Sequence, residues 1–322
     1  MRMGKASRTK QDGDRRARIA AQREAERRSA QRKRIYLAGG SILVVAIVAI
    51  ALVLVKLNSG PPAATGNGPT GTALSALTKQ VEDIPSSVTD KVGSGGVEAG
   101  LFVPTETTTQ VSNAASQLGS YFGTVNSSTP LTSGGKPEVL YLGGEYCPYC
   151  ATQRWAMINA LSRFGTFSGL TTTHSSSTDV DPNTPTFTFY KSTYTSKYIN
   201  FTPVEEYGAT SSTVLQTPTA AEQTLAQTYD PGSGSGSPIP FIDLGNKYVQ
   251  VGNLSPLSPT LLAGKTWAQV GAAMADPSSS SLGTAEIGNA NYMTAAICKL
   301  TNNLPATACT PTIQTLQSGL AS

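Results

Sequence analysis

Two cysteines three positions apart, in the segment YLGGEYCPYCATQRW, are the residues of this chain best suited to chemistry. Thiol–disulfide exchange needs one thiolate that attacks and a second thiol close enough to resolve the mixed disulfide. Cys147 and Cys150 supply both if a helix begins between them, because a helix N-terminus stabilises negative charge on the first sulfur and lowers its pKa. The spacing therefore predicts a redox-active pair in which Cys147 attacks and Cys150 resolves.

Two other interpretations of this pair stay open at this point. A static disulfide across so short a loop stabilises little, because loop-closure entropy grows with loop length. Half of a zinc site would need further Cys or His ligands, and the single histidine, His174, has no second ligand pair at metal-site spacing. The sequence predicts no metal site and no cofactor, and it offers no partner for His174 in a hydrolase triad.

The residues around the cysteines form the predicted active-site turn. Pro148 at the first helical position loses no hydrogen bond, and its fixed φ favours the helix start. Pro148 and Tyr149 together are expected to tune the stability of the thiolate. Glu145, two residues before Cys147, is a candidate proton acceptor or a negative charge that opposes thiolate formation. A solvated loop carboxylate is the alternative.

A second cysteine pair, Cys298 and Cys309, lies near the end of the chain in CKLTNNLPATAC and lacks the short turn. Closing a loop of about a dozen residues contributes roughly 3 kcal/mol in the chain-entropy model. A structural disulfide is therefore predicted here, with a relay that passes electrons to or from the first pair as the alternative.

Apolar patterning predicts the elements that position the first pair. An apolar run at 138–144 predicts a buried strand that ends in glycines, and residues 147–164 follow with helical spacing. Residues 241–251 predict a hairpin around Gly245-Asn246. Other strands are expected at 169–176, and at 186–192 and 198–206 around a turn; other helices are expected at 73–84, 218–229, 261–274 and 285–300. This order of strands and helices predicts an α/β sandwich.

Charge is unevenly distributed along the chain. Residues 1–34 hold 13 Lys and Arg against 4 Asp and Glu, whereas the rest of the chain holds 11 basic and 16 acidic residues. The uncharged apolar run that follows at 35–55 is long enough to cross a bilayer, which takes about 20 residues. It is also longer than the apolar part of most secretory signals. A retained transmembrane anchor at 35–56 is therefore predicted, with a cleaved signal as the alternative.

The anchor would determine on which side of the membrane each other segment of the chain lies. Basic residues stay on the cytoplasmic side of a membrane, so residues 1–34 are predicted to be a cytoplasmic tail that contacts membrane lipid. Nucleic acid is not an expected partner, because no aromatic residues are interleaved there to stack on bases. Residues 57–72 are predicted to be a Gly/Pro-rich linker. Residues 73–322 would then form an extracytoplasmic domain of a single-pass protein of the cell membrane, in a compartment where disulfides persist.

The cysteine turn and the hairpin together resemble the thioredoxin fold. Cys-Pro-Tyr-Cys after a strand is similar to the active-site turn of glutaredoxins and of some periplasmic disulfide isomerases. SPIPFIDLGNKYVQVG resembles the loop and hairpin that carry a cis-proline against the disulfide in thioredoxin-like proteins. By that match Pro240 is the cis-proline, and Ile239 and Pro240 would hold an extended substrate beside Cys147. An ordinary edge proline is the alternative.

The resemblance extends over the whole region after the predicted linker, which is similar to an uncharacterised family of membrane-anchored prokaryotic thioredoxin-like proteins. It implies a thioredoxin-like sandwich with an inserted region between Cys150 and Pro240. The predicted function is a membrane-anchored thiol–disulfide oxidoreductase that acts on exported cysteine-containing proteins and is recycled by a membrane redox partner. The alternatives are a non-enzymatic thioredoxin-like envelope binding module with a static disulfide, and an electron donor to one client. Local motifs do not set the direction of electron flow.

Overall fold

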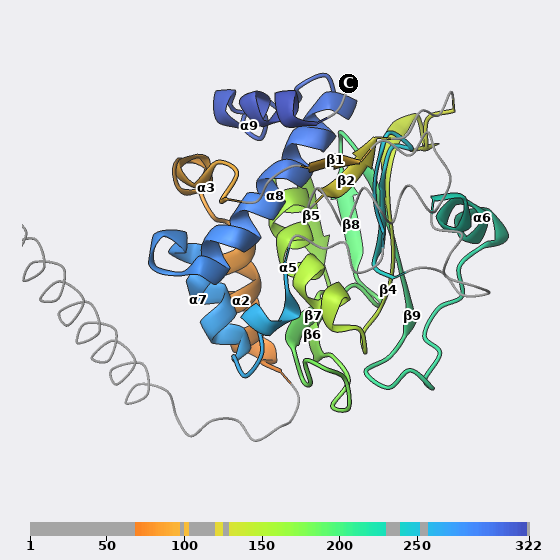
Figure 1. Cartoon of the computed structure of the whole chain (residues 1–322), viewed down its shortest axis with the longest axis vertical. Coiled ribbons are helices and arrows are strands. Elements are labelled where there is room, and N and C mark those ends of the chain that lie inside the picture. The colour runs from red at the N-terminus through yellow and green to blue at the C-terminus, as the bar shows by residue number, and fades with distance from the viewer. Residues whose placement is uncertain are drawn as a thin grey trace, which may run out of the picture. The chain divides into compact units, whose positions relative to one another are not determined.

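The computed structural model (Figure 1) describes residues 68–96, 100–102, 120–124, 129–229, 239–251 and 257–320. The chain divides into a unit of residues 1–66, which lies outside the described residues, and a unit of residues 67–322. The second unit contains both cysteine pairs.

A sheet of seven strands runs through the second unit, and β4 (Lys136–Gly144) lies inside it. β4 pairs in parallel with β9 (Asn200–Tyr207) on one side and antiparallel with β10 (Phe241–Leu244) on the other. The sheet is completed by β1 (Gly100–Phe102), β2 (Ser120–Thr124), β3 (Thr132–Ser133) and β11 (Tyr248–Val251). Because β4 is enclosed on both sides, the turn that follows it starts from a rigid part of the fold.

Two short two-stranded sheets lie between β4 and β9 in the sequence, within the predicted inserted region. β5 (Gly165–Ser168) pairs with β8 (Thr193–Ser196), and β6 (Thr171–His174) pairs with β7 (Pro185–Thr188). The prediction of two strands around a turn at 186–192 and 198–206 was wrong in its pairing. Strand propensity is local, whereas the choice of partner depends on which faces become buried, so the segments joined different strands.

The helices are α2 (Gly71–Glu82), α3 (Ser86–Val92), α5 (Pro148–Ser162), α6 (Ala220–Tyr229), α7 (Trp267–Ala275), α8 (Ser281–Leu300) and α9 (Pro311–Leu316), with short 3₁₀ turns at Pro259–Leu261, Pro277–Ser279 and Gln317–Gly319. Three helices begin and end within two residues of the predicted positions, namely α2, α5 and α6, whereas α7 and α8 begin elsewhere than expected and α3 and α9 were not predicted. In Figure 1, α5, α8, α7 and α2 lie on one side of the sheet and α6 lies on the other.

The two faces of β4 belong to two separate hydrophobic clusters. Val139 and Tyr141 join the larger cluster, in which Trp155 of α5 is fully buried. Leu140 and Leu142 alternate with them and join the cluster beneath α6. Burial on both faces explains why this strand reads as a continuous apolar run rather than as an alternating one.

The predicted fold class, a thioredoxin-like α/β sandwich behind a single transmembrane helix, needs a correction. Helices and strands are mixed as expected, but no helix of the described residues is both long enough and apolar enough to span a bilayer. The longest of them, α8, has 20 residues and carries Glu286, Asn289 and Asn291 inside the core. The predicted anchor at 35–56, the tail at 1–34 and most of the linker at 57–72 lie outside the described residues.

The burial of Glu286 in α8 leads to a prediction about how stability depends on pH. Its side chain is fully buried, and this burial raises its pKa well above the ordinary value, against the smaller effect of a hydrogen bond from the Ala156 backbone. The folded state therefore holds a proton that the unfolded state releases near its ordinary carboxyl pKa, so stability falls as the pH rises above that value. Glu286→Gln is expected to remove this fall, so its advantage over wild type grows with pH, by up to about 1.4 kcal/mol per pH unit. Urea unfolding between pH 5 and 8 measures it.

The control for this prediction is Asp276→Asn, which neutralises an exposed carboxylate. It should leave the pH dependence of stability as in wild type. A constant difference between Glu286→Gln and wild type over the whole pH range would contradict the prediction.

Candidate functional site

The first cysteine pair sits where β4 ends and α5 begins. β4 ends at Gly144, and Cys147 is the residue that caps the N-terminus of α5, with Pro148 in the first turn. The Cys147 sulfur accepts a hydrogen bond from the backbone N–H of Cys150 at 3.3 Å. Both thiols are free of disulfide bonds. The sulfur of Cys147 therefore occupies the place of a capping oxygen, where unpaired N–H groups favour a negative charge.

The environments of the two sulfurs push their pKa values apart. The hydrogen bond with the Cys150 side chain lowers the pKa of Cys147, and the backbone N–H of Cys150 and the charge of Arg154 lower it further, against the effect of burial. Burial raises the pKa of Cys150 well above its ordinary value, and the neighbouring Cys147 raises it further. Cys147 is 6 % exposed and Cys150 is 0 % exposed. The outer sulfur is thus the better thiolate, and the inner one rests as a neutral thiol.

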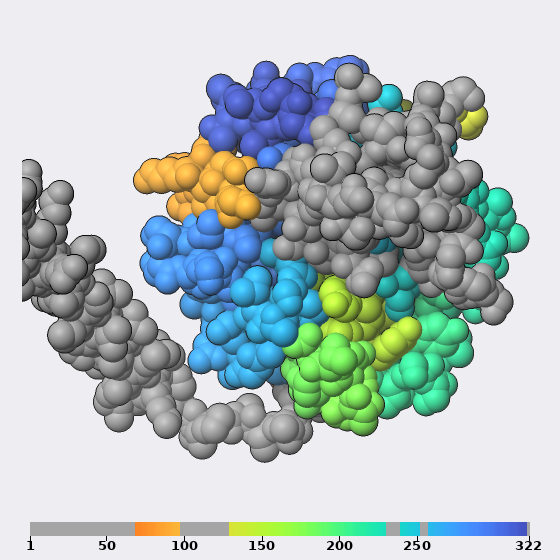
Figure 2. All heavy atoms as spheres, viewed as in Figure 1, coloured from red at the N-terminus to blue at the C-terminus, as the bar shows by residue number. Residues whose placement is uncertain are grey.

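Two segments of the chain hold the turn before Cys147. The N–H groups of Glu145 and Tyr146 donate to the carbonyls of Tyr207 and Gly208 at 2.8 and 3.1 Å, and the N–H of Ser176 donates to the Tyr146 carbonyl at 2.8 Å. In Figure 2, the green β6–β7 segment and the blue-green segment after β9 border yellow-green atoms, the colour of the region around the start of α5. The inserted strands therefore help to fix the turn that carries the cysteines.

The structure places Glu145 beside this inserted region. Its carboxylate accepts a hydrogen bond from the Thr173 hydroxyl at 3.3 Å. The hydrogen bond ties the carboxylate to β6, next to His174, whose ring Nδ1 lies 2.8 Å from the Ser175 carbonyl oxygen. Its predicted role as a proton acceptor, and the tuning roles of Pro148 and Tyr149, stay predictions.

Ile239 and Pro240 lie at the same end of the sheet as the cysteines. The peptide bond between them is cis. Phe241, the next residue, pairs with Leu142 of β4, so the two residues before it run alongside Gly143 and Gly144. A Cβ atom on Gly144 would lie 3.4 Å from the Cδ1 atom of Ile239. The structure thus brings this dipeptide next to the turn, and its role in binding substrate stays a prediction.

A buried ion pair beneath the cysteines was missed in the sequence. Arg154, four residues after Cys150 in α5, donates through Nε and Nη2 to both oxygens of Glu205 in β9, each at 2.7 Å. Both side chains are 0 % exposed. The sequence signal was an arginine on the helix face of Cys150, in a segment otherwise rich in apolar residues, and a glutamate inside a predicted strand. Nothing local indicated that these two residues meet.

The other two cysteines are bonded to each other. Cys298 and Cys309 form a disulfide with a Cα–Cα distance of 5.7 Å. It joins the C-terminal end of α8 to the segment before α9, and in Figure 1 α9 lies at the opposite end of the unit from β6 and β7. Its purely structural role stays a prediction.

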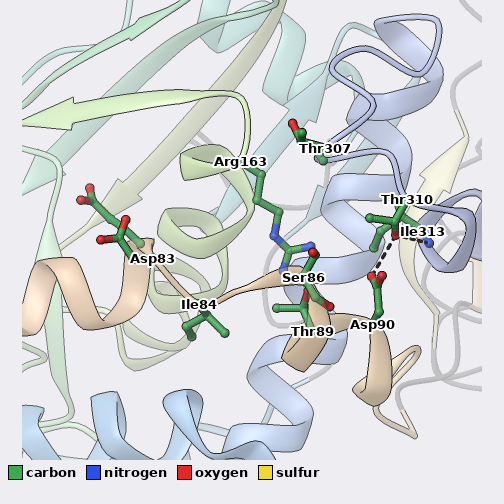
Figure 3. Close-up of a pocket in the computed structure, with 11 residues that line it drawn as sticks. Asp83, Ile84, Ser86, Thr89, Asp90, Arg163, Thr307, Thr310 and Ile313 are labelled. Atoms are coloured by element: carbon green, nitrogen blue, oxygen red, sulfur yellow. Dashed lines mark hydrogen bonds between the residues drawn. The ribbon is translucent and has the colours of Figure 1, made fainter.

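A pocket of about 280 Å³ lies at the far end of α5 from the cysteines. Figure 3 shows Arg163, the residue that follows α5, reaching toward Ser86, while the Thr310 hydroxyl donates to Asp90 at 2.9 Å. Burial raises the pKa of Glu82, which also lines the pocket, to about 7. The residues that line this pocket do not include Cys147 or Cys150, so it is a separate feature.

Metal ligands do not gather within the described ranges, where no three His, Cys, Asp or Glu side chains come together. The absence of a metal and of a cofactor stays a prediction. The site is therefore a dithiol at a strand–helix junction of a mixed α/β unit.

The chain belongs to the family described as a domain of unknown function, DUF929, which residues 124–299 match. The matched region contains Cys147, Cys150, Pro240 and Cys298, and it ends before Cys309. No curated protein and no solved structure matches the chain.

Proposed function

We propose that this protein is a thiol–disulfide oxidoreductase that acts on exported, cysteine-containing proteins. The observation that carries the proposal is the Cys147 sulfur at the N-terminus of α5, which accepts a hydrogen bond from Cys150 and has a lowered pKa beside a buried, neutral thiol. A poised thiolate with a resolving thiol in reach is the minimum that exchange requires. Cys147 attacks the substrate, Cys150 resolves the mixed disulfide, and a membrane redox partner recycles the pair.

The arrangement of strands around the site supports the resemblance to thioredoxin-like oxidoreductases. The strand order β9–β4–β10–β11 has one parallel pair joined through α5 and one antiparallel hairpin that follows a cis-proline. The disulfide between Cys298 and Cys309 supports a compartment in which disulfides persist. Both observations concern the fold and the surroundings, so the reaction itself needs a direct test.

Replacing Cys150 with alanine provides that test. The variant keeps the attacking sulfur but cannot resolve the mixed disulfide, so Cys147 is expected to stay bonded to its substrates. Cells that express the full chain are acid-quenched and alkylated, and trapped partners are separated without reductant. Cys150→Ala should accumulate mixed disulfides that disappear in the double variant with Cys147→Ala. Failure to trap any partner, together with no reduction of insulin by the wild-type protein, would reject the proposal.

The burial of Cys147 favours the second candidate, a non-enzymatic binding module with a static cysteine pair. Because Cys147 is only 6 % exposed, a protein substrate has a narrow approach to it. The reduction potential of the pair, measured against glutathione, separates the candidates, because structural disulfides resist reduction by the glutathione pool. A pair that glutathione does not reduce would favour the binding module.

A further inference from the structure

The polar groups beneath the two thiols include two hydrogen-bond donors that the resting site does not use. Nη1 of Arg154 and the hydroxyl of Tyr141 are both buried, and neither has a hydrogen-bond partner in the described part of the chain. A buried donor without a partner costs free energy. A buried ion pair is in addition often less stabilising than apolar residues of similar volume would be. A use outside the resting state would account for an arrangement that costs free energy at rest.

Helix spacing and a ring contact place both donor side chains near Cys150. Arg154 follows Cys150 by four residues, which places both on one face of α5. The guanidinium carbon lies 5.8 Å from the centre of the Tyr141 ring. The Tyr141 hydroxyl lies over Gly143, where an added Cβ atom would collide with it. The backbone of the next residue, Gly144, forms a hydrogen bond with the Cys150 sulfur. The side chains of Tyr141 and Arg154 are thus neighbours of the buried thiol, and the charge of Arg154 lowers the pKa of Cys150 against the larger effect of burial.

We infer that the Tyr141 hydroxyl and Nη1 of Arg154 stabilise the Cys150 thiolate each time it forms during exchange. This inference rests on the proposed function. The pKa of Tyr141 is raised by burial, so its hydroxyl acts as a donor rather than as a base. Glu205 balances the charge of Arg154 while Cys150 is neutral, and Nη1 remains available for the anion.

Cys150 becomes a thiolate whichever way electrons flow. When a substrate disulfide is reduced, the Cys147 thiolate attacks one substrate sulfur and the other leaves as a thiolate. Cys150 then releases its proton to solvent and attacks Cys147, and the bond from Cys147 to the substrate breaks. Each departing substrate thiolate takes a proton from solvent, and two electrons have passed from the cysteine pair to the substrate. In the reverse reaction Cys150 is the leaving thiolate.

Tyr141→Phe tests the inference, because it removes a hydroxyl that has no partner in the resting site. The full-length chain is oxidised and mixed with glutathione, and each cysteine peptide is followed by acid quench, alkylation and mass spectrometry. Loss of one hydrogen bond to a charged group is expected to slow exchange about tenfold. The rates should fall equally in both directions, so the equilibrium with glutathione stays as in wild type. Thermal stability should be unchanged or higher.

The matched control is Tyr194→Phe. The Tyr194 hydroxyl donates to the Leu161 carbonyl at 2.8 Å, at the other end of α5. This variant should lose thermal stability and keep the wild-type exchange rate. A double variant, Arg154→Met with Glu205→Met, removes the other donor without leaving a buried charge, and its exchange should be slowed at least as much as in Tyr141→Phe.

The outcomes separate the inference from the function on which it rests. Wild-type protein that does not exchange with glutathione rejects the proposed function and this inference with it. Wild-type protein that exchanges, with Tyr141→Phe within about twofold of its rate, rejects the inference alone. A shift in the equilibrium of Tyr141→Phe would also overturn it, because the hydroxyl would then act on the resting thiols.

Discussion

The Cys147→Ser variant is expected to react with oxidised glutathione on the order of 10³-fold more slowly than wild type, because a serine hydroxyl does not form the attacking anion at neutral pH. The remaining thiol does not replace it. Cys150 is 0 % exposed, and burial raises its pKa well above the ordinary value. The rate of reaction with oxidised glutathione is measured by stopping samples of the full-length chain at successive times and alkylating the thiols that remain.

The pH dependence of the wild-type reaction has a defined sign. The pKa of Cys147 is lowered, first by its hydrogen bond with Cys150, so the thiolate persists as the pH falls below the ordinary value of a thiol. The rate should therefore decline only when the pH falls through the lowered pKa.

The control for Cys147→Ser is Cys150→Ser, which keeps the first step and accumulates a stable mixed disulfide with glutathione. A rate for Cys147→Ser within tenfold of wild type would show that Cys150 attacks instead.

Arg154→Met is expected to have the largest effect on stability, a loss of about 3–5 kcal/mol in the free energy of unfolding. The substitution leaves the Glu205 carboxylate buried at 0 % exposure without its cation. The carboxylate would keep the N–H of Phe189, which donates to it at 3.1 Å, but one amide does not replace a bidentate guanidinium. Urea unfolding, followed by circular dichroism, measures the loss.

Two controls separate the buried charge from packing. The double variant, Arg154→Met with Glu205→Met, removes both charges and should recover most of the lost stability. Lys79→Met breaks an exposed pair with Asp83, whose side chains are 80 % and 63 % exposed, and should change stability by less than about 0.5 kcal/mol. A free energy of unfolding for Arg154→Met within about 1 kcal/mol of the wild-type value would contradict the prediction. It would mean that Glu205 becomes protonated or solvated without its partner, so that no uncompensated charge remains in the core.

The elements that depend only on residues close together in the sequence were predicted best. The helix expected at 147–164 is α5, which spans Pro148–Ser162 with Pro148 in its first turn. The hairpin expected at 241–251 consists of β10 and β11, and Gly245 and Asn246 both adopt the positive φ, 68° and 54°, that its turn requires. Capping and turn preferences act within a few residues, so a local segment carries them in full.

The two helix boundaries that were wrong have local causes. The helix expected at 261–274 begins only at Trp267, because Gly264 has a φ of 69° and Thr266 forms a capping box with Gln269. The helix expected at 285–300 begins earlier, at Ser281, where the Ser280 hydroxyl accepts the N–H of Gly283. The residue types that give both signals, a glycine and the hydroxyl residues Thr266 and Ser280, are present in the sequence.

The sequence by itself determined the reactive turn, namely two cysteines, a proline that starts the helix and a strand that ends in glycines. Only the tertiary structure decided what lies beneath that turn. Arg154 and Glu205 are 51 residues apart in the chain and meet because β9 pairs in parallel with β4 under α5. The sign and size of a thiol's pKa shift depend on such neighbours, and long-range pairing is chosen by the burial of whole faces rather than by local preference.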